Sequence, residues 1–180
     1  MVSEEELIRR CVNQGDARAF ELLVERHQSA LRYSLRQMTG WDQDLADDLA
    51  QNTFIKAFKG LTSFRANAKF STWLYRIAYN EFVSHCRKHK LETSGGGEDL
   101  DRFSAPAERN QDLHRDLAIA MLSLSPEQRS ALHLTLHRQC TQQEIAEIMD
   151  CPLGTVKSHI LRGREKLQIA LADWREEIVA

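Results

Sequence analysis

The sequence has few residues of the kinds that break or cross-link a chain. Of its 180 residues only 3 are proline and 8 are glycine, and no proline precedes Pro106. The 4 cysteines are scattered without a C-x-x-C pair, which argues against a disulfide scaffold or a cysteine-rich zinc site. No apolar run approaches the roughly 18 residues that span a bilayer, and the acidic start does not have the order of a signal peptide. We therefore expect a protein of the reducing cytoplasm.

The residues that are abundant favour helices. Leucine and alanine together number 40, against 15 for valine and isoleucine, and unbranched side chains lose less rotamer freedom in a helix. We expect an all-α protein and consider a β-sandwich or a doubly wound sheet improbable. The net charge of -2 also shows that the whole molecule is not a basic nucleic-acid binder.

One segment divides the chain. Residues 92–116 contain three consecutive glycines and carry 3 basic and 7 acidic residues, without periodic apolar positions. This composition is typical of a flexible linker. We therefore expect two small helical domains, residues 1–91 with a charge of +3 and residues 117–180 with a charge of -1, joined by an acidic tether.

Helical periodicity and capping signals place the elements. In the first domain they predict helices over 20–38 and 42–58, and a third from Ser71 or Thr72 to about Lys90. In the second domain Ser125 and Thr141 each begin a capping pattern. The break at 150–152 is followed by a predicted helix over 153–174. A short helix, a tight turn and a longer helix predict a helix-turn-helix.

Three faces carry side chains that suggest binding. On the last helix, hydroxyl and cationic side chains suit a DNA major groove; a plain solvated face is the alternative. The stretch 64–82 combines six aromatic residues with cations, which suits a single nucleic-acid strand. Because aromatic residues at helical spacing usually pack inside, about half of these rings are expected to be buried, with Tyr79 the best candidate for an exposed one. The third face is acidic and polar, and suits either a basic partner helix or solvent.

Catalytic and metal-binding signals are weak. The sequence has no nucleophile elbow, phosphate loop or H-E-x-x-H motif. His85, Cys86 and His89 lie close in sequence, but they make a poor ligand set. We expect no enzyme activity, no cofactor, no metal and no small-molecule substrate.

Three segments, in order, resemble the sigma factors of bacterial RNA polymerase, of the extracytoplasmic-function type. Residues 46–54 (ADDLAQNTF) are similar to the segment that docks on the polymerase clamp helices. Residues 70–80 (FSTWLYRIAYN) resemble the helix that melts and recognises the -10 element. Residues 144–146 (EIA) and 152–164 (PLGTVKSHILRGR) resemble the -35 helix-turn-helix. The resemblance covers nearly the whole chain.

The resemblance implies a role for each face. It assigns core polymerase binding to Asp44, Asp47, Asp48, Gln51 and Asn52. It assigns -10 DNA to Lys69, Thr72, Trp73, Arg76, Tyr79, Asn80, Val83, Arg87 and Lys88. It assigns -35 DNA to Thr155, Lys157, Ser158, His159, Arg162 and Arg164. The implied partners are core RNA polymerase, promoter DNA (double-stranded at -35, melted at -10), and an anti-sigma factor, which in some cases is membrane-anchored.

The chain also departs from the usual pattern of this family. Asn52 stands where an acidic residue is common, Ser84 where aspartate is frequent, and His159 where arginine is frequent. Gly163 replaces a usual alanine, which would lower helix stability by up to about 1 kcal/mol. Two other functions stay open at this point: a repressor or activator that uses only its helix-turn-helix, and a sigma mimic that titrates an anti-sigma factor.

Overall fold

The computed structural model describes residues 2–64, 69–92 and 111–172, which form eight α-helices, one 3-10 turn and no strand. The prediction of an all-α fold is confirmed. The elements are α1 (Glu4–Gln14), α2 (Ala17–Met38), α3 (Gln43–Gly60), the 3-10 turn η1 (Leu61–Ser63), α4 (Phe70–Glu92), α5 (Gln111–Leu122), α6 (Pro126–Leu136), α7 (Gln142–Met149) and α8 (Leu153–Ala170). None of the described helices is both long and apolar enough to cross a membrane.

The helices fall into two groups, α1 to α4 and α5 to α8, and the predicted helix bounds need corrections. α1 and α5 were not predicted. The predicted linker ran to residue 116, but its last six residues belong to α5, and residues 93–110 lie outside the described residues. α4 begins at Phe70, one residue before the first predicted cap. α8 ends at Ala170, with Leu171 as its cap, so the helix stops short of the predicted end at Trp174, which itself lies outside the described residues.

The apolar stripes predicted from periodicity form the core. In α2, Leu23, Leu31 and Leu35 are fully buried, and in α3 the buried stripe includes Thr53 and Ala57. The Thr53 hydroxyl donates a hydrogen bond to the Leu49 carbonyl, which satisfies its polar group inside the core.

The caps also formed as predicted. Ser125 and Thr141 each accept a hydrogen bond from the backbone three residues later, while the side chains of Gln128 and Glu144 bond back to the cap residues. These reciprocal bonds satisfy amides that a helix leaves unpaired at its start. They fix where α6 and α7 begin.

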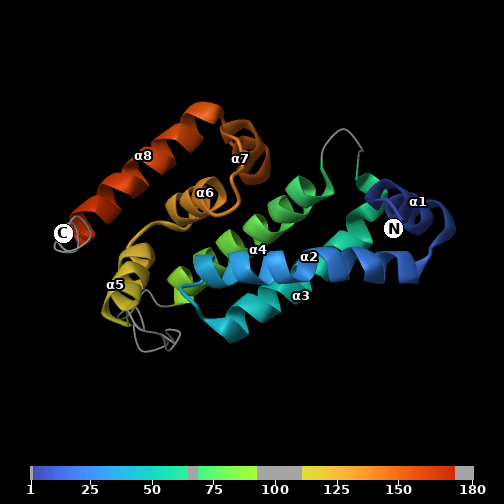
Figure 1. Ribbon diagram of the computed structural model, residues 1–180, viewed down its shortest axis with the longest axis horizontal. Coiled ribbons are helices and arrows are strands. Elements are labelled where there is room, and N and C mark those ends of the chain that lie inside the picture. Colours follow the sequence, from blue (N-terminus) through green and yellow to red (C-terminus); the bar gives the residue numbers. More distant parts are fainter. Residues whose placement is uncertain (1, 65–68, 93–110, 173–180) are drawn as a thin grey trace.

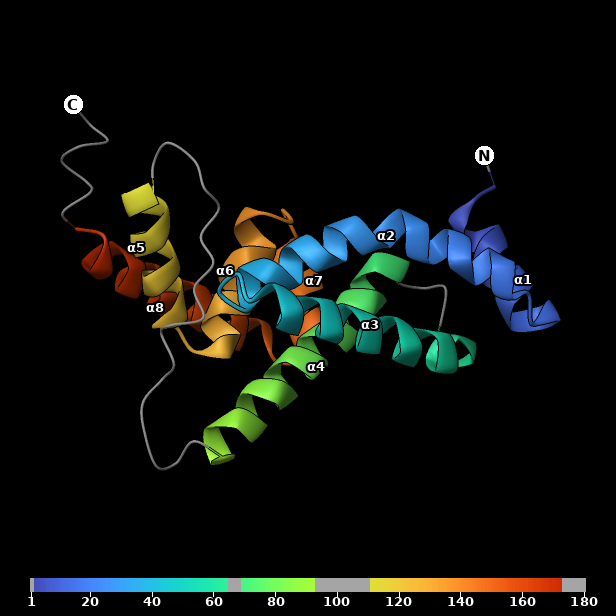
Figure 2. The same cartoon turned by 90° about the horizontal axis from the view of Figure 1, so that it is seen from below.

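α4 lies at the centre of the molecule. α2 and α3 pack along one side of it, and α6 and α7 along another (Figure 1). Figure 2 shows the C-terminal end of α4 projecting away from α2 and α3. The buried apolar side chains of both helical groups form one contiguous cluster. In this structure the two domains are therefore packed together, with α4 shared between them.

Candidate nucleic-acid interface

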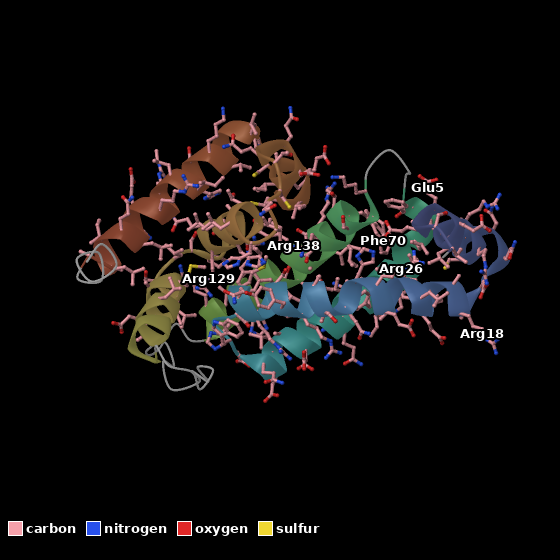
Figure 3. The ribbon with its side chains drawn as sticks, viewed as in Figure 1. Glu5, Arg18, Arg26, Phe70, Arg129 and Arg138 are labelled. Atoms are coloured by element: carbon pink, nitrogen blue, oxygen red, sulfur yellow. The ribbon has the colours of Figure 1, made fainter. Side chains whose placement is uncertain are left out.

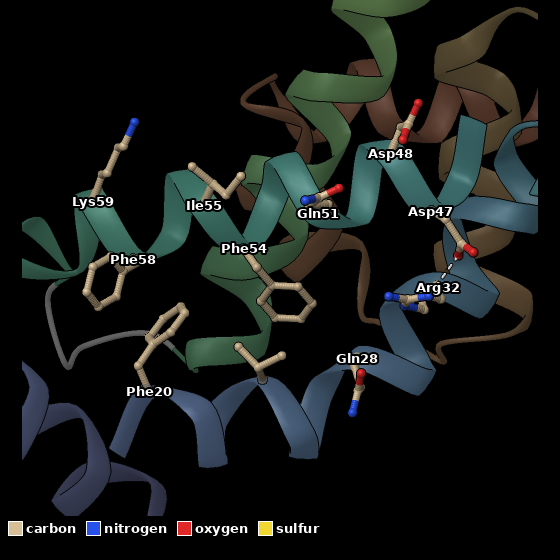
Figure 4. Close-up of a pocket in the computed structure, with 11 residues that line it drawn as sticks. Phe20, Gln28, Arg32, Asp47, Asp48, Gln51, Phe54, Ile55, Phe58 and Lys59 are labelled. Carbon is tan, nitrogen blue, oxygen red and sulfur yellow. Dashed lines mark ion pairs between the residues drawn. The ribbon is translucent and has the colours of Figure 1, made fainter. Parts of the chain in front are cut away.

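The acidic face of α3 borders a groove of about 720 Å³ between α2 and α3. Three of the five predicted docking residues line it: Asp47, Asp48 and Gln51 (Figure 4). Asp44 and Asn52 are exposed on the same helix but do not line the groove. Asp47 is not free, because it pairs with Arg32 of α2 at 3.2 Å. Asp48 and Gln51 are left facing solvent.

The apolar floor of this groove was not predicted. Phe58 is 53 % exposed and Ile55 is 44 % exposed, and the Phe58 ring meets Phe20 of α2 edge-on with centroids 4.9 Å apart. Exposed apolar side chains beside a charged rim mark a surface that another protein covers. The sequence did contain a signal for this floor. Ile55 and Phe58 are three residues apart, so they share one face of the helix, and that face lies outside the apolar stripe that forms the core of α3.

The predicted -10 face of α4 is only partly open. Asn80, Arg87 and Lys88 are exposed and Val83 is half-buried. Tyr79 is only 8 % exposed, so the expectation of an exposed ring there was wrong, and burial raises the pKa of its hydroxyl to about 12. Thr72, 9 % exposed, is also covered. The reason is tertiary, because α6 and α7 pack against the side of α4 that the periodicity assigned to DNA.

The aromatic residues near the start of α4 form a packed cluster. The ring of Trp73 lies 5.4 Å from that of Phe64 and 5.7 Å from that of Phe70. Of the six aromatic residues in the stretch, Phe70, Tyr75, Tyr79 and Phe82 are buried, and Phe64 and Trp73 are half-buried. More rings are therefore buried than the expected half, and Trp73 is the predicted DNA-facing ring that retains solvent access.

Both cations near the start of α4 are paired with acidic residues of the second domain. The Lys69 Nζ lies 2.8 Å from Glu144, and the Arg76 guanidinium lies 3.0 Å from Asp150. The bond from Lys69 is the main cause that lowers the pKa of the Glu144 carboxyl to about 2, with further bonds from Thr141. Two of the four cations assigned to -10 DNA, Lys69 and Arg76, thus pair with carboxylates in this structure.

The predicted -35 face of α8 is open. Lys157, Ser158, Arg162 and Arg164 are exposed, whereas Thr155 and His159 are half-buried. Among the residues that the structure describes, no carboxylate forms an ion pair with Lys157, Arg162 or Arg164. Val156, Ile160 and Gly163 of the same helix are buried and face inward. The Ser158 hydroxyl donates a hydrogen bond to the Gly154 carbonyl at 3.0 Å. Exposed cations without a described carboxylate partner, on one solvent-facing helix, can contact phosphates and base edges.

The backbone of the turn before α8 and the glycine at position 163 of α8 can both be explained from the structure. Asp150 ends α7 in the left-handed region with a φ of 52°, a conformation that aspartate tolerates better than most residues. At Gly163 a methyl group would lie 2.8 Å from Leu132 Cδ1 of α6. Glycine instead of alanine therefore allows the close approach of α6 and α8 that holds the helix-turn-helix together.

The structure offers no support for a metal site in the part of the chain that it describes. No three histidine, cysteine or acidic side chains there gather closely enough to hold an ion. Burial is the first cause that raises the thiol pKa of Cys86 and Cys140, which favours their protonated form.

Comparison with known proteins agrees with these surfaces. Residues 23–92 match the family Sigma-70 region 2, and residues 114–167 match Sigma-70, region 4. The first match contains the groove and α4, and the second contains the helix-turn-helix. The fold and these two matches define a sigma-70-type protein with a region 2 and a region 4 domain.

Full-length relatives identify the type. The chain is 34% identical to the ECF RNA polymerase sigma factor SigW of Bacillus subtilis, over 90% of this chain and 94% of that protein. It is likewise 34% identical to the ECF RNA polymerase sigma-E factor of Escherichia coli K12, over 92% of this chain and 93% of that protein. The chain belongs to the extracytoplasmic-function sigma factors, which direct RNA polymerase to promoters.

Solved structures show the same fold. The sigma factor RpoE bound to the anti-sigma factor NepR from Bartonella quintana superposes with a TM-score of 0.70, at 31% identity over 85% of this chain and 96% of that chain. CnrH in complex with the cytosolic domain of CnrY superposes with a TM-score of 0.69, at 26% identity over 95% of this chain and 99% of that chain.

Proposed function

We propose that the three surfaces divide the work of promoter recognition within this sigma factor. The groove between α2 and α3 docks core RNA polymerase, α4 captures the unpaired -10 strand, and α8 reads the -35 duplex. The groove is the observation that carries the proposal, because it combines an exposed apolar floor with an acidic rim at the predicted docking face. We place the domain boundaries as predicted, residues 1–91 and 117–180, except that α5 extends the second domain to Gln111.

The DNA roles follow from side-chain chemistry. On α8, Arg162 can donate two hydrogen bonds to guanine, while Lys157 and Ser158 hold phosphates. On α4, Trp73 offers a partly accessible ring for base stacking near the cation Arg76, and Arg87 is a further cation about four turns along the same helix. The overall charge of -2 keeps the free chain from binding DNA strongly, so that it depends on polymerase for delivery.

Control by an anti-sigma factor is part of the proposal. Both solved structures named above are complexes with inhibitory partners or with a partner's cytosolic domain. A protein that acts on RNA polymerase works in the cytoplasm as a binding subunit rather than as an enzyme.

The docking role is tested by Asp48→Arg. This exposed residue lines the groove without an ion pair among the described residues, so reversal of its charge should abolish co-purification with core RNA polymerase while the melting temperature stays unchanged. Glu5→Arg, the same charge change on exposed α1, is the control and should co-purify normally (its position is labelled in Figure 3). Normal co-purification of the Asp48→Arg variant would refute the docking assignment.

Run-off transcription with purified core polymerase on a promoter library tests the function as a whole. A sigma factor yields defined start sites only when it is added to the core enzyme. A regulator that uses only the helix-turn-helix, or a sigma mimic, would yield none.

A further inference from the structure

The groove between α2 and α3 has a different chemistry at each of its two ends. Figure 4 shows Phe20 and Phe58 facing each other at one end, near Lys59, and the pair of Arg32 with Asp47 at the other. Phe20 and Arg32 both belong to α2, and their spacing in sequence separates them by about 18 Å along the helix axis. The groove therefore has an elongated apolar floor with charged groups at its ends, which fits one face of an amphipathic helix.

At the Asp47 end, one carboxylate faces two guanidinium groups. The same oxygen, Asp47 Oδ1, lies 3.2 Å from Arg32 Nη1 and 3.8 Å from Arg36 Nη2. Arg32 and Arg36 are one turn apart on α2 and so lie on the same face of the helix. Among the residues that the structure describes, no second carboxylate forms an ion pair with either arginine. Because arginine is always charged in proteins, this cluster of three side chains carries one positive charge in excess.

Asp47 also leaves hydrogen-bond donors of both arginines unused. The Nε atoms of Arg32 and Arg36 are buried and have no hydrogen-bond partner within the described part of the chain, and Asp47 Oδ1 has none there either. An aligned pair of arginine and carboxylate has two parallel N–H···O bonds, whereas here the charges are close without that alignment. A buried donor that lacks an acceptor costs free energy. Both guanidinium groups, which stay partly exposed, can therefore take up a further acceptor.

We propose that Arg32 and Arg36 form an anchor for a carboxylate of core RNA polymerase, carried by the polymerase helix that occupies the groove. The inference rests on the proposed function, because the groove receives this helix only if it is the docking surface. Asp47 is then a positioning residue, which holds the two guanidinium groups at the end of the groove instead of meeting polymerase itself. Asp48, exposed on the rim, remains the acidic residue that faces the partner.

The surroundings of the anchor favour a protein carboxylate over the phosphate of a nucleic acid. The floor beside it is apolar, with Phe54, Ile55 and Phe58 lining the groove, and a phosphate backbone gains nothing from covering such a floor. The exposed carboxylate of Asp48 on the same rim also repels a run of phosphates. An amphipathic helix can instead place a carboxylate beside Arg32, a cation beside Asp48 and apolar side chains over the floor.

The variants Arg32→Gln and Asp47→Asn test the anchor, because both break the same ion pair. If the pair only holds α2 against α3, both variants should change polymerase binding in the same direction. An anchor predicts opposite directions, because Arg32→Gln removes a cation that the partner's carboxylate needs, and Asp47→Asn removes the carboxylate that competes for it.

Titration of the fluorescently labelled full chain with purified core RNA polymerase measures the dissociation constant. Arg32→Gln should bind about twofold to fivefold more weakly than the wild type, as the loss of one partly exposed ion pair predicts. Asp47→Asn should bind about twofold more tightly. Arg32→Lys, which keeps the charge but not the planar fork, should lie between Arg32→Gln and the wild type. The matched control is Arg18→Gln, at an exposed position of the same helix (labelled in Figure 3), which should bind like the wild type.

The outcomes separate the anchor from the function on which it rests. Weaker binding of Asp47→Asn would overturn the anchor, and so would equal affinity of Arg32→Gln and Arg18→Gln. Asp48→Arg in the same titration tests the docking function itself. If Asp48→Arg loses affinity while Arg32→Gln does not, the docking surface stands and only the anchor is refuted. If Asp48→Arg binds like the wild type, the docking assignment fails and the anchor fails with it.

Discussion

Two glycines with nearly the same backbone conformation have different surroundings. Gly15 has a φ of 63° and ends α1, and Gly40 has a φ of 69° in the turn after α2. A methyl group on Gly15 would meet nothing within 4 Å. A methyl group on Gly40 would lie 2.5 Å from Leu122 Cδ2, across the contact between the two domains. Substitutions at Gly15 and Gly40 therefore distinguish the cost of backbone strain from the cost of crowding at the domain interface.

Gly40→Ala should destabilise the protein more than Gly15→Ala. Both variants carry the cost of a left-handed alanine, about 1 kcal/mol. Only Gly40→Ala adds overpacking, which we expect to contribute about 1 kcal/mol more to the loss of unfolding free energy. Urea denaturation of the two variants measures the difference, and a second substitution, Leu122→Ala, should remove it. Equal losses in the two variants would show that the interface at Gly40 is loose.

At the scale of the element, α8 exposes cations with different expected roles. Arg162 and Arg164 are two residues apart on α8 and so lie on different sides of the helix; we expect Arg162 to meet base edges and Arg164 to meet phosphate. Both are exposed, and no described carboxylate pairs with either. A bidentate base contact carries sequence information, and a phosphate contact does not.

Arg162→Ala should weaken holoenzyme binding to a promoter with an intact -35 element by about 1–3 kcal/mol, and it should relax the base preference at one position. Arg164→Ala should weaken binding about uniformly across -35 sequences and reduce the salt dependence by one phosphate contact. Filter binding on a panel of -35 substitutions measures both effects. Unchanged transcription from -35-dependent promoters would show that Arg162 makes no base contact.

The same scale shows what the sequence predicts well. α6 and α7 begin where Ser125 and Thr141 predicted, because a capping box is local and its partners lie three residues apart. Most of the residues predicted for the faces of α3 and α8 are exposed, but Asp47, Thr155 and His159 are half-buried. The face of α4 was not, because the periodicity of one helix cannot show that two different domains pack against it. Tyr79 and Thr72 were misplaced for this reason.

The residues that line the groove between α2 and α3 were predicted only in part, for a related reason. Asp47, Asp48 and Gln51 were predicted from their charge and polarity. Ile55 and Phe58 are apolar, and apolar residues on a helix are ordinarily assigned to the core. Only the tertiary structure shows that the core stripe of α3 lies elsewhere and leaves these two side chains at the surface.

At the scale of the whole molecule, the free energy of unfolding should depend on pH through one buried histidine, His133. His133 of α6 is 1 % exposed and lies against Tyr33 of α2, with ring centroids 6.5 Å apart. Burial, and then the charges of His137 and Arg138, lower its pKa to about 3 from an ordinary value of 6.5. The folded chain therefore keeps this ring neutral at a pH where the unfolded chain protonates it.

The sign of the effect follows from linkage. Above pH 6.5 both states hold His133 neutral and its contribution is constant. As pH falls from 6.5 toward 3 the unfolded state takes up the proton, and the folded state loses about 1.4 kcal/mol per pH unit. The pKa of Glu144 is lowered to about 2 and that of Asp16 is lowered from 3.8, so their stabilising contributions are lost only at lower pH.

We expect His133→Phe to remove most of the loss of stability between pH 6.5 and 4.5. At pH 5 the wild type should be about 2 kcal/mol less stable than at pH 7.5 through this group alone, and the variant should lack that difference. Phenylalanine keeps a ring against Tyr33. The free energy of unfolding at pH 7.5 therefore measures the change in packing, and its change with pH measures the proton uptake. Urea titrations at four pH values measure both quantities. If the free energy of unfolding falls as steeply with pH in the variant as in the wild type, another group takes up the proton. The contact between α2 and α6 would then not be the acid-sensitive part of the protein.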